Sequence, residues 1–380
     1  MTNWHIITCE YPPQVGGVSD YTRLLAEGLR ISGDRVEVWA PAFLSDEQTH
    51  LHRELGEFHP AELRRTSATL DKFPAPRTLL VQWVPHGYGK RGINLGFCRW
   101  IASRARSGDH VHLMVHEPYL ERTQPSWKLR IASFLQRRMI RTLLRASQRV
   151  FISIPAWENY LAPYAPPSTR FEWLPIPATV PVQDGSATDV RSRFAPGSLV
   201  LGHLGTYSPE IVRILAPAIA QVLRELPNTT VLLLGNKSDA FASACQSQSP
   251  DLSARLYAPG HLSDAALSQH LSACDLMLQP YPDGLSSRRT SLMNVLAHGL
   301  PVVSNAGHLT ENLWHESGAV ALSLTSEATQ LATLCTGLLR NSESRREVAQ
   351  AGLALYHSRF DWPNVIAKLR SSSDAVSLAK

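Results

Sequence analysis

One short stretch concentrates residue types that bind phosphate: Ser286, Ser287, Arg288, Arg289 and Thr290. Each guanidinium can make a forked, charge-assisted contact with phosphate oxygens. Ser286 and Ser287 are typical N-cap residues, so we expect a helix to begin near them. A helix N-terminus also offers free N–H groups and a favourable dipole to an anion. The stretch therefore predicts a phosphate site, although an ordinary capped helix with solvated arginines would show the same pattern.

The neighbouring residues predict how this stretch is positioned. Residues 276–278 form an apolar run that is typical of a buried strand. Apolar residues recur at helical spacing over 292–296, and Gly299 followed by Pro301 ends that helix. A second strand is expected to begin at Val302. The arginines thus lie in a loop between a strand and a helix.

The start of the chain has a related pattern. Strands are predicted at 4–8 and 36–39, with a helix between them. This unit is typical of the opening of a doubly wound α/β domain. Gly16 and Gly17 precede the helix, where backbone can approach a ligand closely. The pair lacks the full dinucleotide fingerprint, and a tight turn would also explain it.

Two histidines follow predicted strands in this half. His86 comes after residues 79–84, and His116 comes after residues 111–115. The carboxyl ends of strands form the edge where open α/β sheets bind ligands. A single histidine is more often structural, and His112 inside its strand is interpreted that way. His86 and His116 are therefore both candidates for a residue that approaches a ligand.

The second half repeats the pattern. Strands at 199–204 and 230–234 flank a helix at about 211–226. Residues 150–154 are predicted as the last strand of the first half, and the proline-rich segment after them reads as a linker. We therefore predict two domains, residues 1–177 and 185–360, and a C-terminal helix within 361–380. Two such domains imply a cleft between them.

A basic segment lies in the first half. Residues 122–149 contain eight Lys or Arg and no Asp or Glu. At helical spacing, Arg137, Arg141, Arg145 and Arg149 would share one face. Such a helix is expected to rest on anionic lipid, or else to be a packed helix with a solvated basic face. Nucleic acid is not favoured, because no aromatic interleaving or known binding module accompanies the charges.

Composition sets further limits. The chain has 380 residues, 44% hydrophobic and 18% charged, with a formal net charge of +5. These values are typical of a globular protein. The five cysteines are scattered without a CxxC pair, which indicates a reducing compartment. No signal peptide and no run of 18 apolar residues is visible. We expect a cytoplasmic protein, either free or peripheral on the inner face of the membrane.

Several motifs together resemble the GT-B fold glycosyltransferases of the retaining family four group. They are YPPQVGGVSDYTRLLAEGL near the N-terminus, HEPY around His116, PGHLSDAALSQHLSACDLMLQPYPDG, LMNVLAHGLPVVSN and the final FDW. The resemblance implies two Rossmann-like domains facing a cleft, with the acceptor side first and the donor side second. It also implies that the C-terminal helix crosses back to the first domain.

The resemblance assigns donor contacts. It implies that His116 faces the donor sugar and that the glycine loop at Gly16 and Gly17 covers the diphosphate. Positions expected near the nucleotide or the sugar are Thr206, Gly235, Asn236, Gly260, His261, Ser286, Ser287 and Asn294.

The chain departs from the family at four positions. Ser286 and Asn294 stand where the family carries two glutamates. Thr206 and Ile211 stand where it carries an arginine and a lysine that bind the diphosphate. We expect Arg288 and Arg289 to bind the diphosphate instead, with Arg213 a more remote candidate.

The implied reaction transfers a sugar from a nucleoside diphosphate to an acceptor hydroxyl with retention of configuration. Amides and arginines can stabilise the leaving diphosphate without a metal, and no Asp-x-Asp pair occurs. We therefore expect no metal and no cofactor beyond the nucleotide-sugar donor. The acceptor is expected to be a glycan or glycolipid in surface polysaccharide or glycolipid synthesis. A sugar-nucleotide epimerase and a non-catalytic nucleotide-sugar-binding subunit remain alternatives.

Overall fold

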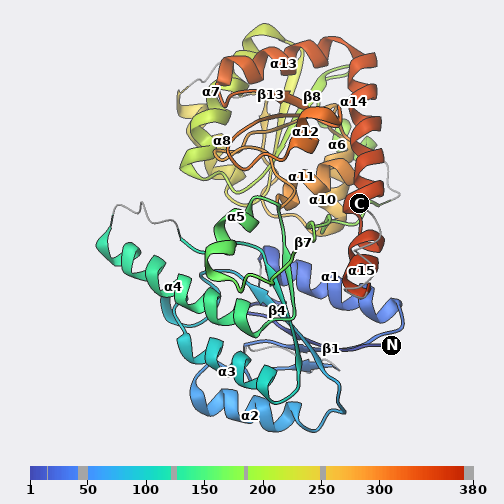
Figure 1. Ribbon diagram of the computed structural model, residues 1–380. Helices are drawn as coiled ribbons and strands as arrows, with labels where there is room; N and C mark the ends of the chain where they lie inside the picture. Colours follow the sequence, from blue (N-terminus) through green and yellow to red (C-terminus); the bar gives the residue numbers. More distant parts are fainter. Residues whose placement is uncertain (15, 42–49, 121–125, 184–186, 249–253, 372–380) are drawn as a thin grey trace. The chain divides into compact units, whose positions relative to one another are not determined.

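The computed structural model describes residues 1–14, 16–41, 50–120, 126–183, 187–248 and 254–371 (Figure 1). The chain divides into two compact units. Unit 1 consists of Met1–Pro175 and Trp362–Lys380, and unit 2 consists of Ile176–Asp361. The last described helix therefore belongs to the same unit as the N-terminus.

The described part of unit 1 is built on a seven-stranded parallel sheet with the order β3-β2-β1-β4-β5-β6-β7. Its strands are β1 (Asn3–Ile7), β2 (Arg35–Trp39), β3 (Leu51–His52), β4 (Thr78–Trp83), β5 (His110–Val115), β6 (Arg149–Ile152) and β7 (Phe171–Trp173). Strand β4 is buried at every position. This is expected of a central parallel strand that helices cover on both faces.

The helices of unit 1 cover the two faces of its sheet. They are α1 (Gly17–Ile31), α2 (Pro60–Leu70), η1 (Lys90–Gly92), α3 (Leu95–Arg106), α4 (Trp127–Ala146), α5 (Trp157–Leu161), η2 (Ala162–Tyr164) and α15 (Trp362–Arg370). The chain leaves β1 toward one edge of the sheet and later returns to build toward the other edge. Because crossovers between parallel strands are right-handed, α1 lies on the face opposite α2, α3 and α4 (Figure 1).

Helix α15 is attached to unit 1 by packing and by a cap. Gly28 on α1 leaves space for Ile366, since a Cβ at Gly28 would lie 3.0 Å from the Ile366 side chain. At the other end, the Arg149 guanidinium donates to the Leu369 and Ser371 carbonyls at 3.0 and 2.7 Å. These are carbonyls that a helix C-terminus otherwise leaves without partners.

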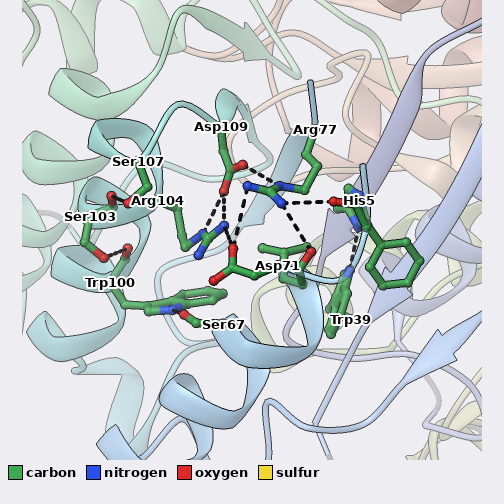
Figure 2. A network of polar contacts seen from close by, with 12 residues as sticks. His5, Trp39, Ser67, Asp71, Arg77, Trp100, Ser103, Arg104, Ser107 and Asp109 are labelled. Carbon is green, nitrogen blue, oxygen red and sulfur yellow. Dashed lines mark hydrogen bonds and ion pairs between the residues drawn. The ribbon is translucent and has the colours of Figure 1, made fainter. Parts of the chain in front are cut away.

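A buried ionic network connects two helices of unit 1 to the sheet (Figure 2). Asp109 is 1% exposed and accepts from Arg77 Nε at 2.6 Å and from Arg104 Nε at 2.7 Å. Arg104 also donates to Asp71 at 2.6 Å. Each buried guanidinium in this network therefore faces a carboxylate, which is the condition under which buried charge is tolerated.

Unit 2 has a second parallel sheet, whose described strands follow the order β10-β9-β8-β11-β12-β13. The strands are β8 (Leu199–Leu204), β9 (Thr229–Leu234), β10 (Leu256–Tyr257), β11 (Leu276–Gln279), β12 (Val302–Asn305) and β13 (Ala321–Ser323). The helices are α6 (Thr188–Arg191), α7 (Pro209–Glu225), α8 (Ser238–Gln248), α10 (Asp264–Ser272), α11 (Thr290–Ala297), α12 (Asn312–Glu316), α13 (Ala328–Arg340), α14 (Ser342–Leu355) and the π-helix η3 (Tyr356–Phe360). Apolar residues of α7 and α13 form the core against β8, β9 and β11.

Three predictions about local structure are wrong. Strand β6 is not the last of its half, because β7 forms inside the segment that was predicted as linker. Helix α11 begins at Thr290, with Arg289 as its N-cap residue, and not near Ser286 or Ser287. The predicted basic helix ends before Arg149, which lies on β6, and Arg137 is only 7% exposed. Two of the four arginines predicted to share a solvated face, Arg137 on α4 and Arg149 on β6, are therefore buried.

Candidate functional site

The carboxyl edge of the unit 2 sheet gathers most of the predicted donor contacts. Thr206 follows β8, Asn236 follows β9 and His261 follows β10, and all three side chains are exposed. The arginine loop follows β11, the other neighbour of β8. Because the chain builds outward in opposite directions from β8 and β11, their boundary is the switch point where open α/β sheets bind ligands.

Glycine is required where the loops after β8 and β9 touch. Gly235 has φ of 101°, and a Cβ there would lie 2.2 Å from the Gly205 carbonyl oxygen. Only glycine adopts this conformation at such a close approach. Gly260, with φ of 78°, has open space around it. Because glycine has no side chain, neither Gly235 nor Gly260 obstructs the carboxyl edge of the sheet.

The arginine loop is held by Asn305 at the end of β12. The Asn305 side chain accepts from Tyr281 N at 2.9 Å and donates to Tyr281 O at 2.8 Å. Gly284, with φ of 90°, packs so closely that a Cβ would lie 2.3 Å from Gly307 N. The backbone that carries the arginines is thus fixed before any ligand binds.

Arg288 and Arg289 both pair with Asp283 through their Nη2 atoms. Burial alone would raise the pKa of Asp283, but the two guanidiniums outweigh it and the pKa is lowered. The Arg289 guanidinium also lies 4.9 Å from the centroid of the Tyr281 ring. The two arginines are therefore gathered at one point, where a carboxylate of the chain itself neutralises part of their charge.

The two serines of the loop have different roles. Ser287 donates to Glu311 through its N–H at 3.0 Å and through its hydroxyl at 2.5 Å. Trp314 donates to the other Glu311 oxygen at 2.8 Å, and burial raises the pKa of this carboxyl. Ser286 is fully buried, and its hydroxyl has no partner among the described residues. Ser287 therefore serves to hold the loop, whereas the Ser286 hydroxyl can still bond a ligand.

Six buried side chains of unit 2 have a polar atom without a partner in the described part of the chain. Thr229, at the start of β9, and His270, on α10, lie away from the carboxyl edge, and the other four lie on it or in the segments that directly follow its strands. The atoms of these four are His203 Nε2, Ser238 Oγ, Gln279 Nε2 and Ser286 Oγ. His203 and Gln279 lie on β8 and β11 at the switch point. Native structures leave few buried polar atoms without partners, so a concentration of them at a ligand-binding edge indicates that a ligand or water completes their bonds.

His203 is neutral at physiological pH. Burial lowers its pKa to about 4. Its Nδ1 lies 2.7 Å from the Leu278 carbonyl oxygen and must donate to it, which makes Nε2 an acceptor. The Gln279 Nε2 group is a donor, because Gln279 Oε1 accepts from Leu204 N at 3.4 Å. The switch point therefore offers one acceptor and one donor to a polar ligand.

Asn294, the predicted ribose contact, is already used within unit 2. It is 5% exposed, and its Oδ1 accepts from the N–H groups of Thr179 and Val180 at 2.9 and 3.1 Å. These bonds attach the segment that enters unit 2 to helix α11. A ribose contact is left to the amide nitrogen and stays a prediction.

In unit 1, the N-terminus of α1 is occupied by Glu10. Its Oε1 accepts from Val18 N and Ser19 N, both at 2.9 Å. A Cβ at Gly16 would lie 2.3 Å from that oxygen, whereas a Cβ at Gly17 would have nothing within 4 Å. Gly16 is thus required by the chain's own carboxylate, which holds the amides that were expected to face a diphosphate.

His116 lies just past β5 and is 9% exposed. Burial lowers its pKa to about 3, so the ring is neutral. Its Nε2 lies 2.7 Å from Gln82 Oε1, and the Tyr21 ring contacts it edge-on at 5.0 Å between centroids. A neutral imidazole can bond a sugar hydroxyl but does not offer a positive charge to phosphate.

Sequence reasoning missed His203, Gln279, Asp283, Glu311 and Glu10. The signal for the first two was available, since each is a polar residue in an otherwise apolar strand. The carboxylates gave no signal, because their partners depend on loop conformation. In the part of the chain that the structure describes, no group of three or more His, Cys, Asp or Glu side chains is arranged to hold a metal ion. None of the described helices is long and apolar enough to cross a membrane.

Comparison with known proteins finds two kinds of similarity in sequence. The family described as Glycosyl transferases group 1 matches residues 198–341. A phosphatidyl-myo-inositol mannosyltransferase of Mycolicibacterium smegmatis is 22% identical over 392 aligned positions, which cover 98% of this chain and 93% of the relative.

Several solved structures resemble the whole chain. Sucrose-phosphate synthase from Thermosynechococcus elongatus has a TM-score of 0.75 at 15% identity, with complete coverage of both chains. HepE from Anabaena, solved in complex with UDP and glucose, has a TM-score of 0.68 at 15% identity, again with complete coverage of both.

Proposed function

We propose that this chain, which carries a glycosyl transferases group 1 domain at residues 198–341 and has the GT-B fold, transfers a sugar from a nucleoside-diphosphate sugar to an acceptor hydroxyl. The observation that carries the proposal is the group of buried, unpartnered polar atoms on the carboxyl edge of unit 2. The arginine pair adjoins them on the loop after β11. Together they give this edge of the sheet polar groups and positively charged side chains, which are what a nucleotide requires.

In the proposed reaction, the acceptor oxygen forms a bond to the anomeric carbon while the bond from that carbon to the diphosphate breaks. The acceptor proton passes to an oxygen of the departing phosphate. Negative charge grows on the diphosphate, and Arg288 and Arg289 stabilise it once they exchange Asp283 for phosphate. No protein group need remove the proton, which is compatible with retention of configuration. We also propose that the clamp works without a metal.

Polar groups at the switch point would hold the base or ribose. His203 offers an acceptor and Gln279 offers a donor, both buried and both on neighbouring strands. Ser286 offers a hydroxyl in the next loop. In unit 1, neutral His116 is proposed to bond the donor sugar. It follows β5 directly, at the carboxyl edge of the unit 1 sheet, which corresponds to the carboxyl edge of the unit 2 sheet.

The proposed acceptor is a glycan or glycolipid in surface polysaccharide or glycolipid synthesis. The likeness to a phosphatidyl-myo-inositol mannosyltransferase supports a lipid-linked acceptor. Helix α4 supports contact with an anionic membrane, because Trp127, Ile131 and Phe134 are exposed on it beside basic residues. These proposals place the protein at the inner face of the membrane as a peripheral enzyme.

The test is incubation of the protein with UDP-glucose, chosen because HepE was solved with UDP and glucose, and then with other nucleoside-diphosphate hexoses. A membrane lipid extract serves as the acceptor source. Release of nucleoside diphosphate together with a new glycoside supports the proposal. An isomerised donor would indicate an epimerase, and binding without turnover would indicate a non-catalytic subunit. Loss of turnover in EDTA would overturn the metal-free clamp.

A further inference from the structure

A groove lined by arginines lies between α3 and α4 of unit 1, and none of its lining residues is assigned to the donor site. The two helices pack side by side (Figure 1), and the groove has a volume of about 800 Å³. Six of its lining residues are Arg99, Arg130, Arg137, Arg138, Arg141 and Arg145. The other lining residues include no Asp or Glu. Such a concentration of unopposed charge is uncommon on a folded surface.

Arg137 forms the buried part of this groove. It is 7% exposed, and its Nε has no partner among the described residues. Its Nη2 donates to the Leu120 carbonyl at 3.4 Å, and its guanidinium lies 4.7 Å from the centroid of the Tyr119 ring. No carboxylate of the described chain forms an ion pair with it, in contrast to buried Arg104 in Figure 2. A buried cation without an anion is costly, and a bound anion would remove that cost.

The remaining five arginines are exposed, and none of them forms an ion pair with a described residue. Arg138, Arg141 and Arg145 are three and four residues apart on α4, so their charges repel one another along the helix. An anion between them would convert this repulsion into attraction. Planar guanidinium groups match the oxygens of phosphate in particular.

We propose that the α3–α4 groove is a binding site for a doubly charged phosphate group. The phosphate is carried either by a lipid headgroup or by a free ligand. Exposed Trp127, Leu129, Ile131 and Phe134 lie on the first turns of the same helix. Apolar side chains beside a phosphate site match the boundary between headgroups and acyl chains. This site is separate from the proposed donor site, so it does not depend on catalysis.

The test compares two charge reversals of equal size. Arg141→Glu/Arg145→Glu alters the groove through exposed residues. The control, Arg64→Glu/Arg65→Glu, alters exposed residues of α2 that do not line the groove. Each variant is checked for folding and for UDP affinity, and its cosedimentation with phosphatidylcholine vesicles containing phosphatidic acid is then measured. Vesicles containing phosphatidylglycerol at the same total charge serve as a second probe.

The groove variant is expected to lose vesicle affinity by at least about thirtyfold, because each of the two lost basic residues contributes about 1 kcal/mol near an anionic surface and the added glutamates are repelled by it. The control is expected to stay within about threefold. Preference for phosphatidic acid over phosphatidylglycerol would support a site for a doubly charged phosphate. Equal losses in both variants, or no preference between the lipids, would overturn a lipid headgroup as the source of the phosphate and would leave only a general surface charge to explain vesicle binding.

Inorganic pyrophosphate distinguishes the two sources. Calorimetry should show one pyrophosphate-binding site fewer in the groove variant than in the control. The lost site is the groove, since the donor site of unit 2 is unchanged in both variants. Loss of that site together with weak vesicle binding by the wild-type protein would identify a free phosphate ligand. Loss of the site together with strong vesicle binding would identify a lipid headgroup. An equal number of pyrophosphate sites in both variants, or tighter binding of single-stranded RNA than of either probe, would contradict the proposal.

Discussion

The N-terminus of α1 in unit 1 and the arginine loop of unit 2 were both expected to bind phosphate, and in both an acidic side chain of the chain itself is present. In unit 1, Glu10 accepts two backbone N–H groups, and Gly16 has no space for any larger residue. In unit 2, Asp283 pairs with two long side chains, beside buried atoms that have no partner. Backbone amides held in a helix cannot turn away from Glu10, whereas guanidiniums can exchange one anion for another. We infer that the first site is closed and the second is open.

The pH dependence of stability tests a feature that the two units share. Burial lowers the pKa of His116 to about 3 and that of His203 to about 4, from an ordinary 6.5. Below pH 6.5 the unfolded chain binds protons that the folded chain does not, so the free energy of unfolding falls until the folded pKa is reached. We expect a loss on the order of 2–3 kcal/mol per histidine between pH 6.5 and pH 4.

Urea denaturation of His203→Gln at several pH values measures this effect against the wild-type protein. The variant should lose less stability than the wild type over that range. His261→Gln is the control, because His261 is exposed. A slope unchanged in His203→Gln would show that His203 is accessible to protons in the folded protein.

Gly16→Ala tests whether the first site is closed. The added Cβ would lie 2.3 Å from Glu10 Oε1 and would displace the carboxylate from α1. Loss of two charge-assisted hydrogen bonds is expected to lower the free energy of unfolding by about 2–3 kcal/mol. Gly17→Ala has open space and should change stability by less than about 1 kcal/mol. Equal stabilities of the two variants in urea would contradict the close approach of Glu10.

Arg288→Ala and Arg289→Ala test whether the second site is open. Removing a charge-assisted contact to phosphate costs about 1.5–3 kcal/mol, so UDP affinity should fall about tenfold to a hundredfold in at least one variant. Lysine should rescue only partly, because it cannot make the forked contact. Calorimetry with Arg224→Ala, an exposed residue of α7, provides the control. If neither variant loses affinity, the diphosphate is held elsewhere.

The sequence predicted both parallel sheets because apolar runs and turn residues mark buried strands directly. Edge strands such as β3 and β10 were not predicted, because a strand of two residues is too short to show an alternating pattern. The helix start near Ser286 was wrong because Glu311, 24 residues later, takes the N–H and hydroxyl of Ser287. Arg149 was predicted on the helix because it lies four residues after Arg145, although α4 itself ends at Ala146. Tertiary partners decided each of these cases, and no local pattern contains them.

The smallest expected effect comes from replacing the acidic side chain at each of the two sites, and it compares the sites most directly. Asp283 pairs with Arg288 and Arg289 in the free chain, so UDP must displace it. Asp283→Asn removes the competing charge while keeping a side chain of the same size, and we expect UDP affinity to rise about threefold to tenfold. The side chains of these ion pairs are mostly buried, and the cost of removing their charges from water offsets much of their attraction, which limits the gain.

Glu10→Gln is the matched change in unit 1, since it also converts a carboxylate to an amide at a site once expected to bind phosphate. It should leave UDP affinity unchanged, because the amides of Val18 and Ser19 keep an oxygen partner and the site stays closed. Calorimetry at fixed ionic strength measures both variants. A gain in Glu10→Gln as large as in Asp283→Asn would mean that α1 also binds the nucleotide. A loss in Asp283→Asn would mean instead that this carboxylate positions the arginines for phosphate, as a fixed part of the site.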